Sequence, residues 1–262
     1  MRSTFSTWRR ALRIAGATLT LLGGCGLPPV PVSKDSERYE FEVGRVSLEA
    51  NRFLDAQAHF KRFLDLHPGH ALADSAQFLL GMAQYKGKSF AEAAVEFSIL
   101  VREFPRSLLR DDAAYQECLC YVGQMRPPQL DATFALRART CLQEFQLRYP
   151  ESPHTADTRE RLIEVADRLA EKEHQIGMMW IKRKQWASAL VYFEVVLRDT
   201  PESRWVPEAL LWKARCHELL GQSAEAEATY RRLIADFPGH RAAVEAEHRS
   251  SAAEPQTAPE PR

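Results

Sequence analysis

Cysteine is the residue type in this 262-residue sequence whose spacing could carry nucleophilic, redox or metal chemistry. Cys118 and Cys120 are separated by one residue inside a helical pattern, so their side chains lie about 200° apart, which suits neither a shared metal nor a bridge between the two. Cys141 and Cys216 follow further along the chain. A disulfide among these four is an open alternative in an oxidising compartment, and buried free thiols are the interpretation that the pattern favours.

Two other local patterns resemble a phosphate-binding loop and a metal site, but the sequence around each of them does not fit that function. The segment "GMAQYKGKS" at residues 81–89 has five residues between its glycines, where a phosphate-binding loop has four, and no strand precedes it. The Pro-Gly-His sequences at residues 68–70 and 238–240 are turns that close a repeat, and no second histidine or cysteine recurs at a ligand spacing. Since the sequence also lacks H-E-x-x-H and G-x-S-x-G, we expect no enzyme activity, no metal and no cofactor.

The fifth cysteine, Cys25, has a different context. Residues 1–24 combine arginines, a short apolar run and small residues, which is typical of a secretory signal peptide. The sequence "LGGC" that ends at Cys25 resembles the lipobox of bacterial lipoproteins, so we expect cleavage before Cys25 and acylation of its thiol. Residues 25–35 would then be a proline-rich tether, and Gly26 resembles the residue that sorts lipoproteins to the outer membrane. The alternative is an ordinary signal peptide followed by an incidental cysteine.

Charge and composition narrow the function further. The chain has 35 basic and 35 acidic residues, and removal of residues 1–24 takes away four arginines and leaves 31 basic residues. No dense basic cluster remains in this mildly acidic chain, so we expect no nucleic-acid partner. Residues 246–262 are low in large apolar residues and broken by proline, which predicts a disordered tail.

A repeat emerges when the chain is aligned with itself. An alanine is followed four residues later by an aromatic residue and eight residues after that by a proline. Four copies keep this order and a fifth has leucine in place of the aromatic residue: Ala56-Phe60-Pro68, Ala93-Phe97-Pro105, Ala138-Leu142-Pro150, Ala189-Phe193-Pro201 and Ala226-Tyr230-Pro238. A small residue lies on the preceding helix of each copy: Gly44, Gly81, Cys118, Gly177 and Ala214. This is the tetratricopeptide pattern, and it predicts an all-α superhelical solenoid of five helix-turn-helix repeats.

The spacing of the copies predicts how the solenoid is organised. Most repeats are 37 residues apart, but the third and fourth are 59 apart. A longer turn at residues 123–134 and a longer first helix of the fourth repeat, capped by Ser152 or Thr155, account for the excess. We therefore expect a bend between an N-terminal block, residues 36–152, and a C-terminal block, residues 153–245. Within a repeat we expect the small residues to touch, Gly81 against Ala93 and Gly177 against Ala189.

Residues 36–240 resemble a known family. The segments that carry the resemblance are "FLLGMAQYKGKSFAEAAVEFSILVREFPRS", "RPPQLDATFALRARTCLQEFQLRYPES" and "RLAEKEHQIGMMWIKRKQWASALVYFEVVLRDTPES". They are similar to the BamD family, the tetratricopeptide lipoproteins of the β-barrel assembly machinery. The resemblance implies a scaffold on the periplasmic face of the outer membrane, with the barrel component BamA, other Bam lipoproteins and unfolded outer-membrane proteins as partners. The C-terminal tail and the cysteines of the third repeat depart from the family.

The resemblance also implies two sites. The C-terminal repeats would dock a POTRA domain of BamA, and we expect Arg183, Trp186, Trp205 and Trp212 to make this contact, because aromatic and arginine side chains dominate interfaces. The alternative is that the tryptophans pack between repeats.

The first three repeats would hold clients in a groove. We expect its lining to follow stripes spaced i, i+4, i+7 along the first helices: Phe41, Phe78, Met82, Tyr85, Tyr115 and Leu119. The alternative is that the next repeat buries these side chains. Two other functions remain open, an envelope coordinator resembling CpoB and a lipoprotein enzyme whose site forms only in three dimensions.

Overall fold

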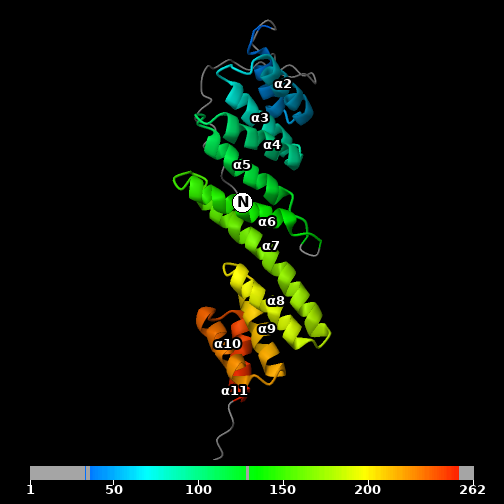
Figure 1. Ribbon diagram of the computed structural model, residues 1–262, viewed down its shortest axis with the longest axis vertical. Coiled ribbons are helices and arrows are strands. Elements are labelled where there is room, and N and C mark those ends of the chain that lie inside the picture. The colour runs from blue at the N-terminus through cyan, green and yellow to red at the C-terminus, as the bar shows by residue number, and fades with distance from the viewer. Residues whose placement is uncertain (1–32, 34–35, 128–129, 254–262) are drawn as a thin grey trace, which may run out of the picture.

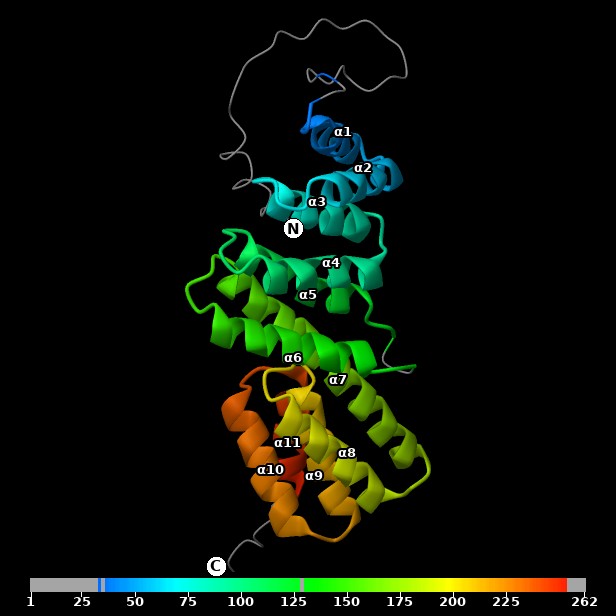
Figure 2. The same cartoon turned by 45° about the horizontal axis from the view of Figure 1, so that its top comes forward.

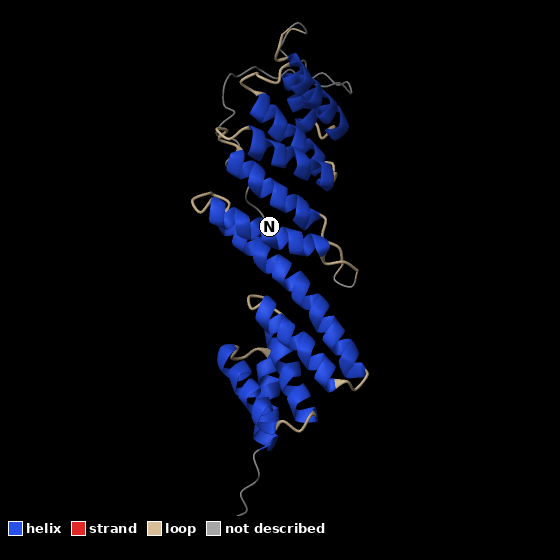
Figure 3. Cartoon of the chain, viewed as in Figure 1, coloured by secondary structure: helices blue, strands red, loops and turns tan. Residues whose placement is uncertain are grey.

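The computed structural model describes residues 33, 36–127 and 130–253, which form eleven α-helices (Figure 1). The first ten are paired: α1 (Tyr39–Glu49) with α2 (Phe53–Leu66), α3 (Ala73–Lys86) with α4 (Phe90–Glu103), α5 (Arg110–Gly123) with α6 (Thr133–Arg148), α7 (Thr155–Lys182) with α8 (Trp186–Asp199), and α9 (Val206–Leu219) with α10 (Ser223–Asp236). The last helix is α11 (Arg241–Ala253). The pairs stack along the long axis and every regular element drawn is helical, so the prediction of an all-α tetratricopeptide solenoid is confirmed (Figure 3).

The two helices of a repeat meet where a glycine faces an aromatic ring. A Cβ atom placed on Gly81 would lie 2.7 Å from the ring of Phe97, and one on Gly177 would lie 2.8 Å from the ring of Phe193. The expected partner of Gly81 was Ala93, which lies one helical turn before Phe97 and is itself fully buried. The small residue on the first helix therefore makes room for the ring, and the contact of Gly81 with Ala93 stays a prediction.

We expect Ala93→Leu to lower the free energy of unfolding by about 1 to 3 kcal/mol, because the added carbons must enter a filled core. Ala93 has 0% exposed surface. Ala91→Leu is the matched control, since Ala91 lies on the same helix and is exposed. Urea unfolding followed by circular dichroism measures both. Equal midpoints for the two variants would show that α4 is packed in another register.

The long helix α7 joins the two blocks. Near its middle it supplies Val165 and Leu169 to the core of the third repeat and Ala170 to the core that contains Phe193. With 28 residues it is about 42 Å long, and it crosses obliquely between the two groups of repeats (Figure 2). The predicted long first helix of the fourth repeat is present, although its N-cap residue, His154, makes no side-chain capping bond.

Serine and aspartate side chains hold successive repeats together. The hydroxyl of Ser107 donates to Asp74 over 2.6 Å, and the hydroxyl of Ser203 donates to Asp167 over 2.8 Å. Each serine follows a repeat-closing proline by two residues and also accepts a backbone N–H two residues later. His70 and His240 take the serine's place in the two Pro-Gly-His turns and accept the N–H groups of Leu72 and Ala242. These histidines therefore act as turn residues, as predicted.

An additional helix covers the end of the array. Residues 246–262 were expected to be disordered, but α11 runs from Arg241 to Ala253, so the prediction was wrong for residues 246–253. Ala242, Ala243 and Ala246 are buried against α9 and α10. Alanines at these positions give the helix an apolar face that covers the last repeat, which would otherwise expose its core. Residues 254–262 lie outside the described part of the chain.

Candidate partner-binding surfaces

The C-terminal block gathers the tryptophans, and two of them belong largely to its core. Trp205 packs against the imidazole of His174, with ring centroids 4.7 Å apart. His174 is buried, and burial lowers its pKa to about 4, so the ring is neutral at neutral pH. Trp205 and Trp212 both pack against the core that contains Phe193. Most of the surface of both side chains is therefore buried by packing between repeats, as the alternative interpretation of the sequence held.

One face of the Trp212 ring contacts the guanidinium of Arg215. Its ring stacks on Phe193, with centroids 6.4 Å apart and planes inclined by 19°, and the guanidinium of Arg215 lies 4.1 Å from the Trp212 centroid. Arg215 also pairs with Glu245 of the capping helix, at 3.5 Å. Arg215 was not predicted as a site residue, although its position three residues after Trp212 on one helix face is readable from the sequence.

The turn between α7 and α8 is the exposed part of the predicted docking site. Lys182, Arg183 and Lys184 are all exposed, and we call these three residues the basic turn. Arg183 lies over the ring of Trp180, with its guanidinium carbon 5.3 Å from the centroid. Trp186 begins α8 directly after the turn and is half-buried. Of the four predicted docking residues Arg183 is exposed, and Trp186 is half-buried like Trp205 and Trp212, which pack against the core that contains Phe193.

The predicted client groove is wrong in three of its six residues. Phe41, Phe78 and Tyr115 are 8%, 1% and 2% exposed, and each lies in a hydrophobic core. Phe78 packs on Phe97 within its repeat, with ring centroids 5.5 Å apart. The next repeats and the partner helices bury these rings, as the alternative interpretation held, so they are not available to a client.

Tyr115 has a structural role at the junction of the two blocks. Its ring stacks on His154, with centroids 4.5 Å apart, and its hydroxyl donates to the carboxylate of Asp157 on α7. Burial, followed by the neighbouring Asp157 carboxylate, raises the pKa of the Tyr115 hydroxyl, so it stays protonated and remains a donor. This contact ties α5 to α7.

The other three predicted groove residues remain partly exposed, and the structure places them on a slightly different stripe. Helix α3 is buried on most sides and meets solvent mainly along Ser75, Leu79, Met82 and Lys86. The equivalent positions of α5 are Asp112, Gln116, Leu119 and Gly123. Met82 and Leu119 lie on these stripes, whereas Tyr85 packs edge-on against Phe90. The solvent-facing stripe is therefore rotated from Phe78 and Tyr85 toward Leu79 and Lys86, and it shares Met82 with the predicted stripe.

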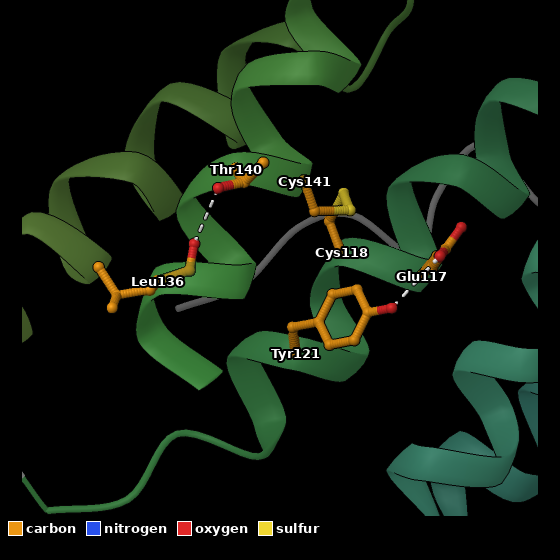
Figure 4. The surroundings of a disulfide bond; sticks show 6 residues. All are labelled: Glu117, Cys118, Tyr121, Leu136, Thr140 and Cys141. Carbon is orange, nitrogen blue, oxygen red and sulfur yellow. Dashed lines mark hydrogen bonds between the residues drawn. A yellow bond between two sulfur atoms is a disulfide. The ribbon is translucent and has the colours of Figure 1, made fainter. Parts of the chain in front are cut away.

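The third repeat contains a disulfide. Cys118 of α5 is bonded to Cys141 of α6, and the bridge lies between the two helices (Figure 4). Cys120 and Cys216 are buried free thiols, whose pKa values burial raises to about 12 and about 11. The interpretation as buried free thiols was therefore wrong for Cys118 and Cys141 and right for the other two. The argument that Cys118 and Cys120 do not pair with each other is confirmed.

The position of the bridge explains why this repeat departs from the pattern. Cys118 occupies the small position of the first helix, and Cys141 precedes Leu142, which stands where the other repeats have an aromatic ring. The third repeat has no aromatic ring at this position. The disulfide joins its two helices at the level where the ring packs in the other repeats.

We expect reduction of this bridge to lower the melting temperature by on the order of 5 to 10 °C, since opening a loop of this size releases about 3 kcal/mol of constraint on the unfolded chain. The two cysteines are 23 residues apart. Thermal unfolding with and without dithiothreitol measures the shift, which should be absent in Cys141→Ala and present in Cys120→Ala. A shift that persists in Cys141→Ala would assign it to another cause.

Cys25, the expected lipid attachment site, lies outside the described residues. Within the described part of the chain, none of the helices combines the length and the apolar character that crossing a bilayer requires. Among those same residues, His, Cys, Asp and Glu side chains do not come together in the groups of three or more that a metal site needs.

Comparison with known proteins decides the family. A family model described as an outer membrane lipoprotein, YfiO, matches residues 33–249, which include all five repeats and most of the capping helix. The chain belongs to the YfiO family. The outer membrane protein assembly factor BamD of Caulobacter vibrioides is 25% identical over 236 residues, which cover 90% of this chain and 77% of that protein. The protein of the same name in Haemophilus influenzae is 22% identical over 231 residues, covering 84% of this chain and 88% of that protein.

Solved structures include a tetratricopeptide protein of Bacteroides fragilis. It is 12% identical, covers 83% of this chain and 98% of its own, and has a TM-score of 0.48. The repeat architecture of the YfiO family member is read from its own helix pairs and their glycine–aromatic contacts.

Proposed function

We propose that the chain is a non-enzymatic assembly factor for outer-membrane proteins, anchored by a lipid on Cys25 to the periplasmic face of the outer membrane. The match of the YfiO family model to residues 33–249 carries this proposal, because it spans the whole repeat array rather than a few repeats. The relatives named as BamD support the same role. A solenoid of this kind offers extended surfaces to several partners at once.

The C-terminal block is the proposed docking site for a POTRA domain of a BamA-like barrel protein, and other Bam lipoproteins would join the same complex. The exposed basic turn and the half-buried Trp186 support this assignment, because arginine and tryptophan side chains contribute strongly to interfaces. Trp212 would contribute its partly exposed face beside Arg215.

The N-terminal block is the proposed site for unfolded outer-membrane proteins. Its contact residues would be Leu79 and Met82 of α3 and Leu119 of α5, which are partly exposed, and Met82 and Leu119 stand at equivalent positions of successive repeats. Apolar side chains on a solvent-facing stripe suit an extended segment with alternating apolar residues, which is what an unfolded barrel strand presents.

We expect Met82→Gln combined with Leu119→Gln to weaken binding of a peptide from the C-terminal strand of a barrel protein by about tenfold, because two apolar contacts are lost. Both residues are only partly buried, so the helical content should be unchanged. Fluorescence anisotropy with a labelled peptide measures the affinity.

Phe78→Ala is the control for this experiment. Phe78 is 1% exposed, so the substitution should reduce stability by about 3 to 5 kcal/mol through a core cavity rather than act on the peptide directly. Normal peptide binding by the folded glutamine double variant would move the client site away from α3 and α5.

A further inference from the structure

Solvent reaches the disulfide of the third repeat at Cys141 rather than at Cys118. An open groove of about 460 Å³ runs between α5 and α6, and its lining includes Glu117, Tyr121, Leu136, Arg137, Thr140 and Cys141. Figure 4 shows Tyr121, Leu136 and Thr140 around the bridge, with Cys141 on the α6 side. Cys141 is partly exposed and lines the groove, whereas Cys118 is 1% exposed and does not line it.

The third cysteine of the repeat faces elsewhere. Cys120 is fully buried and packs in the core that contains Phe78, Phe97 and Leu100. Two residues along a helix turn the side chain by about 200°, so Cys120 is directed away from the groove that Cys141 lines. In the folded chain, therefore, an external molecule could reach the thiol of Cys141 but not those of Cys118 and Cys120.

We propose that Cys141 is the site at which an external disulfide oxidant reacts with this protein, and that Cys118 then closes the bridge. In the first step the Cys141 thiolate attacks one sulfur of the oxidant's disulfide, forms a mixed disulfide, and releases the other sulfur as a thiolate. In the second step the Cys118 thiolate attacks Sγ of Cys141 and releases the remaining oxidant thiolate. The two protein thiols lose two electrons and two protons, and the oxidant's disulfide is reduced to two thiols.

Access decides this order. Exchange requires an approach to a sulfur atom along an open path, and the rate depends on that access as well as on thiolate chemistry. Cys118 lies at the contact between α5 and α6, where three of the other repeats bury a glycine under a ring, so an external disulfide would have to part the helices to reach it. The buried Cys120 is held out of the exchange, and its raised pKa also keeps it in the unreactive thiol form.

The charge of the groove indicates which oxidants enter best. Glu117 and Glu144 line it together with one cation, Arg137. Burial removes water from the Glu117 carboxylate and raises its pKa. An oxidant that carries positive charge beside its disulfide would be favoured, and cystamine is a small probe with this property.

The test uses the full chain, reduced and then freed of reductant under native conditions. Cys118→Ala should trap a cystamine adduct on Cys141, and Cys141→Ala should form an adduct on Cys118 at least tenfold more slowly. Mass spectrometry of proteolytic peptides resolves each cysteine, Cys25 included. Cys120→Ala should close the bridge at the wild-type rate. Circular dichroism establishes that each variant is folded.

A second measurement covers the case in which a variant fails to fold. The reduced wild-type chain receives a short pulse of cystamine, the reaction is quenched with acid, and the adducts are mapped. We expect the Cys141 adduct to exceed the Cys118 and Cys120 adducts at least tenfold. Equal or faster modification of Cys118 or Cys120 in the folded chain, in either experiment, would overturn the proposal.

Discussion

Cys25→Ser is expected to convert the protein from a detergent-soluble membrane component into a water-soluble periplasmic protein. Each buried methylene of an acyl chain contributes about 0.8 kcal/mol to membrane attachment, and two or more chains hold a protein stably. The described helices supply no other membrane-crossing element. Partition of the purified protein between detergent and aqueous phases measures the change, and the whole chain should move from the detergent phase to the aqueous phase.

Purification before partition matters, because a membrane-bound partner could retain an unlipidated chain. Cys120→Ala is the control, since it removes a buried thiol and should leave the protein in the detergent phase. If purified Cys25→Ser still partitioned into detergent, the lipid would be attached elsewhere or the chain would hold to the membrane by another means.

Arg183→Glu combined with Trp186→Ala is expected to weaken binding to a BamA-like barrel protein by about 10- to 100-fold, because substitutions of central arginine and tryptophan residues typically cost 1 to 3 kcal/mol or more. The reversal also places an acidic group between Lys182 and Lys184, which weakens any attraction to an acidic surface. Surface plasmon resonance with the purified POTRA domains measures the affinity.

The matched control is Arg106→Glu combined with Leu108→Ala. Both residues are exposed in the turn between α4 and α5, and Leu108 is 92% exposed, so the change alters charge and apolar surface to a similar degree in the other block. Its affinity should equal that of the wild type. If the control weakened binding and the C-terminal variant did not, the barrel protein would dock on the N-terminal block.

The repeat positions were predictable because they are fixed by contacts inside a repeat. A glycine or alanine must stand where a ring packs on the first helix, so Gly81 and Gly177 are readable from sequence. The long α7 was predictable because residues 153–180 begin with a proline and then contain neither another proline nor a second turn signal. The sequence did not show that the ring lies nearest to each glycine, since the aromatic residue and the alanine lie one turn apart on the same face.

The client stripe failed for a different reason. Phe78, Met82 and Tyr85 have helical spacing, but so do Leu79, Met82 and Lys86, and only the packing of neighbouring repeats decides which stripe is buried. In a solenoid the first helices contact several neighbours, so most of α3 is apolar and the composition of a stripe does not reveal its exposure. Large aromatic side chains are, on average, highly buried in protein cores.

The disulfide and the capping helix depend on contacts between segments that the sequence does not pair. Cys118 and Cys141 come together because the third repeat aligns their helices despite a longer turn between them. Residues 241–253 are too polar to predict a helix with confidence from periodicity, and they fold against α9 and α10 because that end of the array has an open apolar face.

We propose that this YfiO family member works within an outer-membrane assembly complex. The most direct test is affinity purification of the full-length lipidated chain from detergent-solubilised outer membranes, followed by identification of the proteins that remain bound at high salt. We predict that a large outer-membrane barrel protein with POTRA domains co-purifies in near-stoichiometric amount with the wild type and is lost from Arg183→Glu combined with Trp186→Ala. Recovery of the wild-type chain without any such barrel protein would contradict the claim.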